Sequence, residues 1–284
     1  MQELDNLDVM RDLLERHLAS DRLAIPSLPD VAVRVVGSDA RKSGNAQLLA
    51  DIIHSDAGLT EYVLHIVASA AKRPAIAIAS LQHAIAWLGL DEVANIAFTL
   101  ALQGKMLHVQ GQQRKARRLW RHALASAFWS RQLAHARDGD TGLCYLCGLL
   151  HNIGKVVALG VAHEVAQRSD LQLSLEDYDH LIEIFQREVG TRVISAWALA
   201  PPVPIIIACW QSYQTAGAVR WESNVVNVAH KLADFTTHEP AMLKRDALVI
   251  DPAIRDLGLS AQEASLLLDS TASINAEMDR YLSP

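Results

Sequence analysis

The segment that most constrains the fold is Leu149–Val157, which lies inside a longer apolar run over residues 142–161. Its apolar residues recur at helical spacing, which predicts a helix that is buried over most of its circumference. His151, Asn152 and Lys155 interrupt this apolar surface. Buried polar groups need partners, because leaving one unsatisfied costs on the order of a few kcal/mol. The segment therefore predicts a functional site or the remnant of one.

The rest of the chain predicts an all-helical protein. Half of its 284 residues are hydrophobic, enough for a sizeable core. Short amphipathic segments begin after capping residues such as Ser80 and Asp91, and the capping box Ser260-x-x-Glu263 opens the last predicted helix. The segment around the interrupted apolar run predicts one continuous helix from Thr141 to Leu159. The sequence contains no strand pattern and no fixed-period repeat.

The order of the segments predicts three parts. Residues 1–20 contain an amphipathic helix that needs a partner surface. Residues 21–112 predict an N-terminal lobe of short helices, and residues 113–284 predict a second helical lobe with a C-terminal extension. The polar stretch Gln110–Lys115 marks the boundary between the lobes. The first helix and the C-terminal segment both offer apolar faces to a partner protein or to a second copy of the chain.

Charge and cysteine content bound the partners and the compartment. The net charge is -6 with acidic and basic residues interspersed, which gives no general attraction for nucleic acid or anionic membranes. Three cysteines and the absence of a signal-peptide pattern favour a reducing cytoplasm. We find no uninterrupted apolar run close to the roughly 18 residues that a membrane span requires. We therefore expect a cytoplasmic protein that binds neither nucleic acid nor membrane.

Two local clusters could carry chemistry of their own. Cys144-x-x-Cys147 has the spacing of a redox pair or of half a zinc site, with Cys209 as the one further thiol. A structural zinc site normally requires four ligands, so we expect two small apolar thiols in a core helix.

The second cluster is a basic run that could contact phosphate or nucleic acid. No aromatic residues are interleaved with its charges, and the chain as a whole is acidic, so a solvated helix face is favoured. The run comprises Arg114, Lys115, Arg117, Arg118 and Arg121.

Several short motifs resemble those of the HDOD domain, a bacterial signalling module related to the HD superfamily of metal-dependent phosphohydrolases. Their order and spacing are more specific than any one motif. They are Ile25–Pro29, Ile53–Thr60, Ser80–Gly89, Leu119–His122, Gly148–Lys155, and Val189-Gly190 with Trp197. The similarity covers about Leu23 to Tyr213. It implies an all-α, two-lobed helical bundle whose C-terminal lobe is HD-like, and a role as a regulatory or output domain in signal transduction.

The resemblance also implies a site. HD phosphohydrolases hold divalent metal with a distant His, an adjacent His-Asp pair and a later Asp, and the metal activates water for attack on phosphorus. Here His122 matches the first His, His151 and Asn152 match the pair, and the last Asp matches His230 or Asp234. Hard cations prefer carboxylate oxygen, whereas an amide is neutral. We therefore interpret these residues as a vestigial site with no catalytic residue, no metal and no cofactor.

The neighbours of this site have simple structural interpretations. His122 and His151 could hydrogen-bond each other, Asn152 or a backbone carbonyl, which would hold two helices in register. Lys155, which we group with the vestigial site, is expected to reach water from the end of its helix. Gly154 is expected to be a close-packing position. Trp210 is a candidate to fill the former pocket.

Three functions remain as hypotheses. The leading one is a non-catalytic signal-transduction module that acts on a protein partner in a signalling pathway and could form a homo-oligomer. The first alternative is a divergent phosphohydrolase that uses His122, His151, His230 and Asp234 with a softer transition metal. The second is a sensor that binds a nucleotide second messenger in the pocket without cleaving it.

Overall fold

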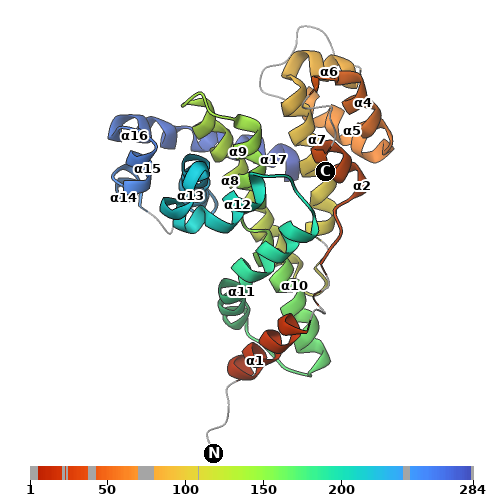
Figure 1. The fold of residues 1–284 in the computed structure, drawn as a ribbon, viewed down its shortest axis with the longest axis vertical. Coiled ribbons are helices and arrows are strands. Elements are labelled where there is room, and N and C mark those ends of the chain that lie inside the picture. Colours follow the sequence, from red (N-terminus) through yellow and green to blue (C-terminus); the bar gives the residue numbers. More distant parts are fainter. Residues whose placement is uncertain are drawn as a thin grey trace, which may run out of the picture.

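The protein is all-helical throughout the part described by the computed structural model, which comprises residues 6–20, 23, 25–37, 43–69, 80–107, 109–238 and 244–282. The chain is 81% helical and contains no strand within these residues, so the predicted fold class is confirmed. The N-terminal lobe contains α2 (Asp30–Gly37), α4 (Ala46–His54), α5 (Ala57–Ala68), α6 (Leu81–Leu88) and α7 (Leu90–Met106). These helices gather at one end of the molecule (Figure 1).

The second lobe is built around α8, which packs against α9 and α13. Its elements are α8 (Gln113–His135), α9 (Thr141–Leu150), α10 (Ile153–Arg168), α11 (Leu175–Ala196), α12 (Val203–Cys209), the 3-10 segments Trp210–Thr215 and Gly217–Val219, and α13 (Arg220–Thr237). The C-terminal helices are α14 (Arg245–Val249), α15 (Pro252–Asp256), α16 (Ala261–Asp269) and α17 (Thr271–Leu282). The division of the chain at residue 112 stays a prediction, although α8 begins close to it.

The first helix, α1 (Asn6–Ala19), packs against α10 of the second lobe (Figure 1). Met10, Leu14 and Leu18 form its buried face. The apolar stripe predicted to need a partner surface therefore finds one within the same chain.

Two of the three predicted helix starts follow the predicted capping chemistry. The Ser80 side chain accepts a hydrogen bond from the backbone N–H of His83, and Ser260 and Glu263 form the expected capping box. The prediction that Asp91 caps a helix is wrong, because α7 begins at Leu90, directly after Gly89. Asp91 instead lies in the first turn, where the helix dipole favours its charge.

The predicted continuous helix from Thr141 to Leu159 is interrupted. It consists of two helices, α9 and α10. His151 is the C-cap of α9, and Asn152, at φ -103° and ψ 12°, is the N-cap of α10. The Nδ1 atom of His151 lies 2.6 Å from the carbonyl oxygen of Gly148. A side chain thus bonds to the backbone at the point where the first helix ends, which periodicity of apolar residues does not reveal.

Contrary to the sequence estimate, residues 141–168 together are long and apolar enough to cross a membrane by length and composition. In the structure, 89% of the most apolar window of this segment is buried against the rest of the protein. The segment forms the centre of the second lobe.

The helices α10 and α11 approach closely at two glycines. A Cβ atom at Gly154 would lie 2.7 Å from the backbone nitrogen of Gly190 and would also overlap the carbonyl oxygen of Gln186. Both obstacles are backbone atoms, so neither can rotate away. The prediction that Gly154 is a close-packing position is confirmed.

We predict that Gly154→Ala destabilises the protein by about 1–3 kcal/mol or more, because the added methyl group forces α10 and α11 apart. Gly160→Ala is the matched control on the same helix, since its Cβ would meet only Val109 Cγ1, at 4.0 Å. That change should be neutral or stabilising, because alanine has the higher helix propensity. Urea unfolding of both variants measures the difference, and equal midpoints would contradict the prediction.

The two lobes contact each other directly through α7 and α8, and α17 adds further contacts. Arg131 of α8 pairs with Glu92 of α7 and with Glu277 of α17, the latter at 2.6 Å. Near the end of the chain, the side-chain amide of Gln103 on α7 donates to the carbonyl oxygen of Tyr281, at 3.1 Å. The C-terminal helix therefore contacts both lobes.

Candidate functional site

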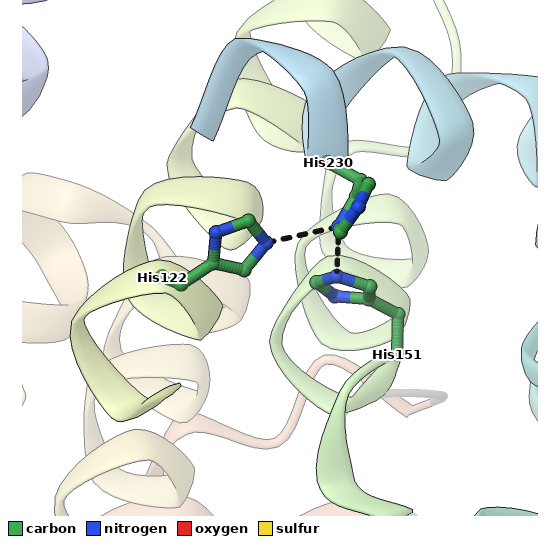
Figure 2. Close-up of side chains that lie close together, drawn as sticks. All are labelled: His122, His151 and His230. Atoms are coloured by element: carbon green, nitrogen blue, oxygen red, sulfur yellow. Dashed lines mark hydrogen bonds between the residues drawn. The ribbon is translucent and has the colours of Figure 1, made fainter. Parts of the chain in front are cut away.

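Three histidines from three helices converge at the centre of the second lobe. His122 comes from α8, His151 from the junction of α9 and α10, and His230 from α13 (Figure 2). His122 Nε2 lies 2.9 Å from His230 Nδ1, and His151 Nε2 lies 3.0 Å from the same atom. One nitrogen from each ring lies within 4.8 Å of the others. We call these three residues the histidine cluster.

The outer ring nitrogens of the cluster face oxygen atoms. His151 Nδ1 bonds to the Gly148 carbonyl, and His122 Nδ1 lies 3.3 Å from Asp234 Oδ1. His230 Nε2 lies 3.6 Å from the other carboxylate oxygen of Asp234. The sequence left open whether His230 or Asp234 matches the last acid of the HD pattern. His230 reaches the point of convergence, and Asp234 lies one turn further along α13, behind the rings.

The three converging nitrogens, His122 Nε2, His151 Nε2 and His230 Nδ1, have too few protons to satisfy one another by hydrogen bonds. A carbonyl only accepts, so the neutral His151 ring carries its proton on Nδ1 and presents a lone pair at Nε2. An ionised Asp234 likewise favours a proton on the outer nitrogen of His122, which leaves a second lone pair at the centre. One His230 Nδ1 proton must then serve two acceptors. That arrangement also points the lone pair of His230 Nε2 at Asp234, which is unfavourable.

A single cation at the centre would remove this conflict. It would take a lone pair from each ring and place the His230 proton on Nε2, facing Asp234. All three outer N–H groups would then face an oxygen, as is usual for metal-bound histidines. The donor set fits one transition-metal ion, which imidazole suits. It does not fit hard-metal hydrolytic chemistry, because no carboxylate oxygen is among the three converging donors.

All three rings have lowered pKa values. Burial is the main cause for each. The pKa of His151 falls to about 3, despite the opposing effect of its bond to Gly148, and Lys155 lowers it further. The pKa values of His122 and His230 lie well below the ordinary 6.5, lowered by burial and then by neighbouring positive charge. Neutral imidazoles are the form that binds metal. Burial also raises the pKa of Asp234.

Asn152 and Trp210 complete the surroundings of the cluster. The Asn152 side chain is buried, and its Oδ1 atom has no hydrogen-bond partner among the described residues. The Trp210 ring lies 5.0 Å from that of His151 and 4.8 Å from that of His230. Trp210 is therefore packed beside the cluster, where it was expected to fill the former pocket.

Three other sequence interpretations can be compared with the structure. Lys155 pairs with the exposed Glu183 of α11, a partner that the sequence did not identify. The alternative in which His122 and His151 bond each other is replaced by a contact of both rings with His230. Burial raises the pKa of both Cys144 and Cys147, and both thiols lie fully inside the core. This agrees with the expected role of these cysteines as small apolar core residues.

Sequence reasoning missed the contribution of His238, whose Nδ1 atom lies 3.6 Å from Asp234 Oδ1. A signal was available, because His230, Asp234 and His238 recur every four residues, the spacing of one helix face, although α13 ends at Thr237 and His238 is its C-cap. It also missed the Gly148 carbonyl, for which the sequence offers no signal.

Comparison with known proteins places this architecture among HD-like helical folds. A crystal structure of an HDOD domain protein of unknown function from Geobacter sulfurreducens has a TM-score of 0.72 at 20% identity and covers 98% of this chain and 100% of its own. A protein from Shewanella amazonensis, provisionally named a metal-dependent phosphohydrolase, has a TM-score of 0.69 at 22% identity over 97% and 100% of the two chains. Identities this low show a shared fold.

A third structure, from Marinobacter aquaeolei and provisionally named a signal transduction protein, has a TM-score of 0.69 at 23% identity and covers 100% of this chain and 68% of its own. An uncharacterized Treponema pallidum protein is 26% identical over 188 residues, which are 63% of this chain and 36% of that protein. This chain thus matches about a third of its relative's length. Residues 25–213 match the HDOD domain, and the chain belongs to the HDOD family.

We predict that the chelator-treated protein loses stability in acid. The unfolded chain protonates its histidines below about pH 6.5, whereas folded His151 stays neutral down to about pH 3. The lowered pKa has no effect on stability above about pH 6.5, where the ring is neutral in both states, and it destabilises the fold progressively as the pH falls from there toward 3. Each buried imidazole adds a slope of up to about 1.4 kcal/mol per pH unit.

Urea unfolding between pH 7.5 and pH 4.5, a range of about three units, measures the slope. His151→Gln removes one of the titrating groups and should make the slope shallower, and His230→Gln provides a second test if the first variant folds poorly. Slopes equal to that of the wild type in both variants would show that these rings do not determine the acid sensitivity.

Proposed function

We propose that this chain is a regulatory module of bacterial signal transduction that does not hydrolyse phosphate esters. The observation that carries the proposal is the donor set at the centre of the site. Three neutral imidazole nitrogens converge there. The Asp234 carboxylate faces the outer nitrogens of His122 and His230 and does not belong to the converging set. Asn152 stands where the HD pattern has an acid, so the charge that would balance a hard divalent metal is missing.

Access to the centre supports the same conclusion. The His122 and His151 side chains are buried, and the ring of Trp210, itself buried, stands against two of the three histidines. A phosphate ester would have to displace this packing to reach the ring nitrogens. The signalling name of the similar Marinobacter protein agrees with a regulatory role. The proposal also includes three expectations from the sequence. They are binding to a protein partner, association with a second copy of the chain and a cytoplasmic location.

A divergent phosphohydrolase is the second candidate, and one observation favours it. The proton shortage among the inner nitrogens is relieved by a cation, so a softer transition metal would have a prepared set of donors. Metal alone does not distinguish the candidates, since an ion that only ties α8, α9 and α13 together would be structural. Turnover does distinguish them.

We predict that the purified 284-residue chain gives no turnover of bis(p-nitrophenyl) phosphate above background with added Mg²⁺, Mn²⁺, Fe²⁺ or Zn²⁺. The double variant Asn152→Asp/His230→Asp restores two carboxylates to the HD pattern and should gain affinity for Mn²⁺, because oxygen donors suit harder cations. Elemental analysis and calorimetric titration with Mn²⁺ measure that gain. His54→Gln, an exposed change on α4, is the control.

Wild-type turnover that disappears in His151→Ala would overturn the proposal in favour of the phosphohydrolase. Stoichiometric metal without turnover would leave the regulatory function in place and identify the ion as a structural one. His54→Gln should match the wild type in both measurements.

A further inference from the structure

A groove of about 1000 Å³ lies between the two lobes, away from the histidine cluster. Helices α5 and α7 form one wall, and α8 and α17 form the other. Leu59, Ile66, Leu100 and Tyr281 supply apolar lining. None of the three clustered histidines is among the residues that line it.

The basic run of α8 divides between this groove and the protein interior. Arg114, Arg117, Arg118 and Arg121 all line the groove, since their spacing of three and four residues places them on one face of the helix. Lys115 points away, because it is buried and its ammonium group donates to the Leu175 carbonyl at 2.8 Å and pairs with Asp179 at 2.7 Å. The basic run is therefore not one solvated helix face, as the sequence favoured. Its four arginines line the groove, and its lysine is buried.

The arginines of the groove have little local neutralisation. Within the described residues, no carboxylate forms an ion pair with Arg114, Arg117 or Arg118, all of which are exposed. Arg121 donates to the side-chain oxygen of Asn275, at 3.4 Å, and Arg280 of α17 adds a fifth guanidinium group. Among the lining residues that the structure describes, one is acidic, Asp56, and its carboxylate already accepts the N–H of Leu59 as a helix cap. The cleft is thus positive in a chain of net charge -6.

These features define the chemistry of an occupant. Guanidinium groups bind phosphate through paired hydrogen bonds, and a cleft with low-dielectric walls concentrates their field. Arg114 and Arg121 are about 10 Å apart along the helix axis, which suits more than one phosphate group. Tyr62 lines the same groove with 49% of its surface exposed and offers a ring for stacking. Apolar lining and an exposed aromatic ring suit a ligand that carries a flat ring as well as charge.

We propose that the groove between the lobes binds a nucleotide that carries two or more phosphate groups. The arginines of α8 and Arg280 of α17 hold the phosphates, and Tyr62 stacks on the base. The walls belong to both lobes, so the bound nucleotide contacts α5 and α7 on one side and α8 and α17 on the other. The proposal concerns a site distinct from the histidine cluster, and it does not depend on whether that cluster holds metal.

The test is equilibrium dialysis of the full chain against radiolabelled ATP and GTP, in EDTA and at low salt. The double variant Arg117→Ala/Arg118→Ala should weaken binding about tenfold or more, because it removes two charged donors. The double variant Arg11→Ala/Arg187→Ala removes the same charge from exposed positions on α1 and α11 and should bind like the wild type. Thermal unfolding shows whether the two doubles are equally folded.

A third variant separates recognition of the base from recognition of phosphate. Tyr62→Ala should weaken nucleotide binding about fivefold or more and leave the affinity for inorganic tripolyphosphate unchanged. No retention of either nucleotide, or equal affinity in the two arginine doubles, would overturn the proposal. Tripolyphosphate binding as tightly as the nucleotides, with no effect of Tyr62→Ala, would reduce the groove to a phosphate site and overturn it as well. A single-stranded oligonucleotide that binds where neither nucleotide competes would assign the groove to nucleic acid instead.

Discussion

The bond between the His151 ring and the Gly148 carbonyl is the interaction on which the second lobe depends. It occurs at the point where a buried apolar segment changes from α9 to α10, and it determines which ring nitrogen carries the proton. With that tautomer set, the other nitrogen must find a donor or a cation from across the core. His230 on α13 and His122 on α8 meet it there. Burial of polar groups thus selects how three helices are packed around one another.

The sequence predicted what local patterns can determine. Apolar periodicity and capping residues such as Ser80 located most helices, because these depend on neighbours within a few positions. The interruption after Leu150 was missed, since it depends on a side chain bonding to its own backbone. The partner of Lys155 was missed because Glu183 lies on another helix, 28 residues away. Likewise, only the tertiary structure separates Lys115 from the arginines around it.

Under the proposed function, the HD-like fold is kept while its chemistry differs. His230 reaches the centre of the site, and Asp234 faces the outer nitrogens of His122 and His230 from one turn further along α13. Structures with the same fold and different provisional names therefore say little about the reaction, which depends on donors at a few positions.

Arg121 and His122 are consecutive residues on α8, yet one lines the groove between the lobes and the other belongs to the histidine cluster. A helix is stiff over this distance, so a ligand that shifted α8 at the groove would also move the His122 ring. Thermodynamic linkage then requires reciprocity. If an occupant of the groove changes the affinity for the cation by some factor, the cation changes the affinity for that occupant by the same factor. Binding in the groove and binding of a cation at the histidine cluster would in this way be coupled through α8.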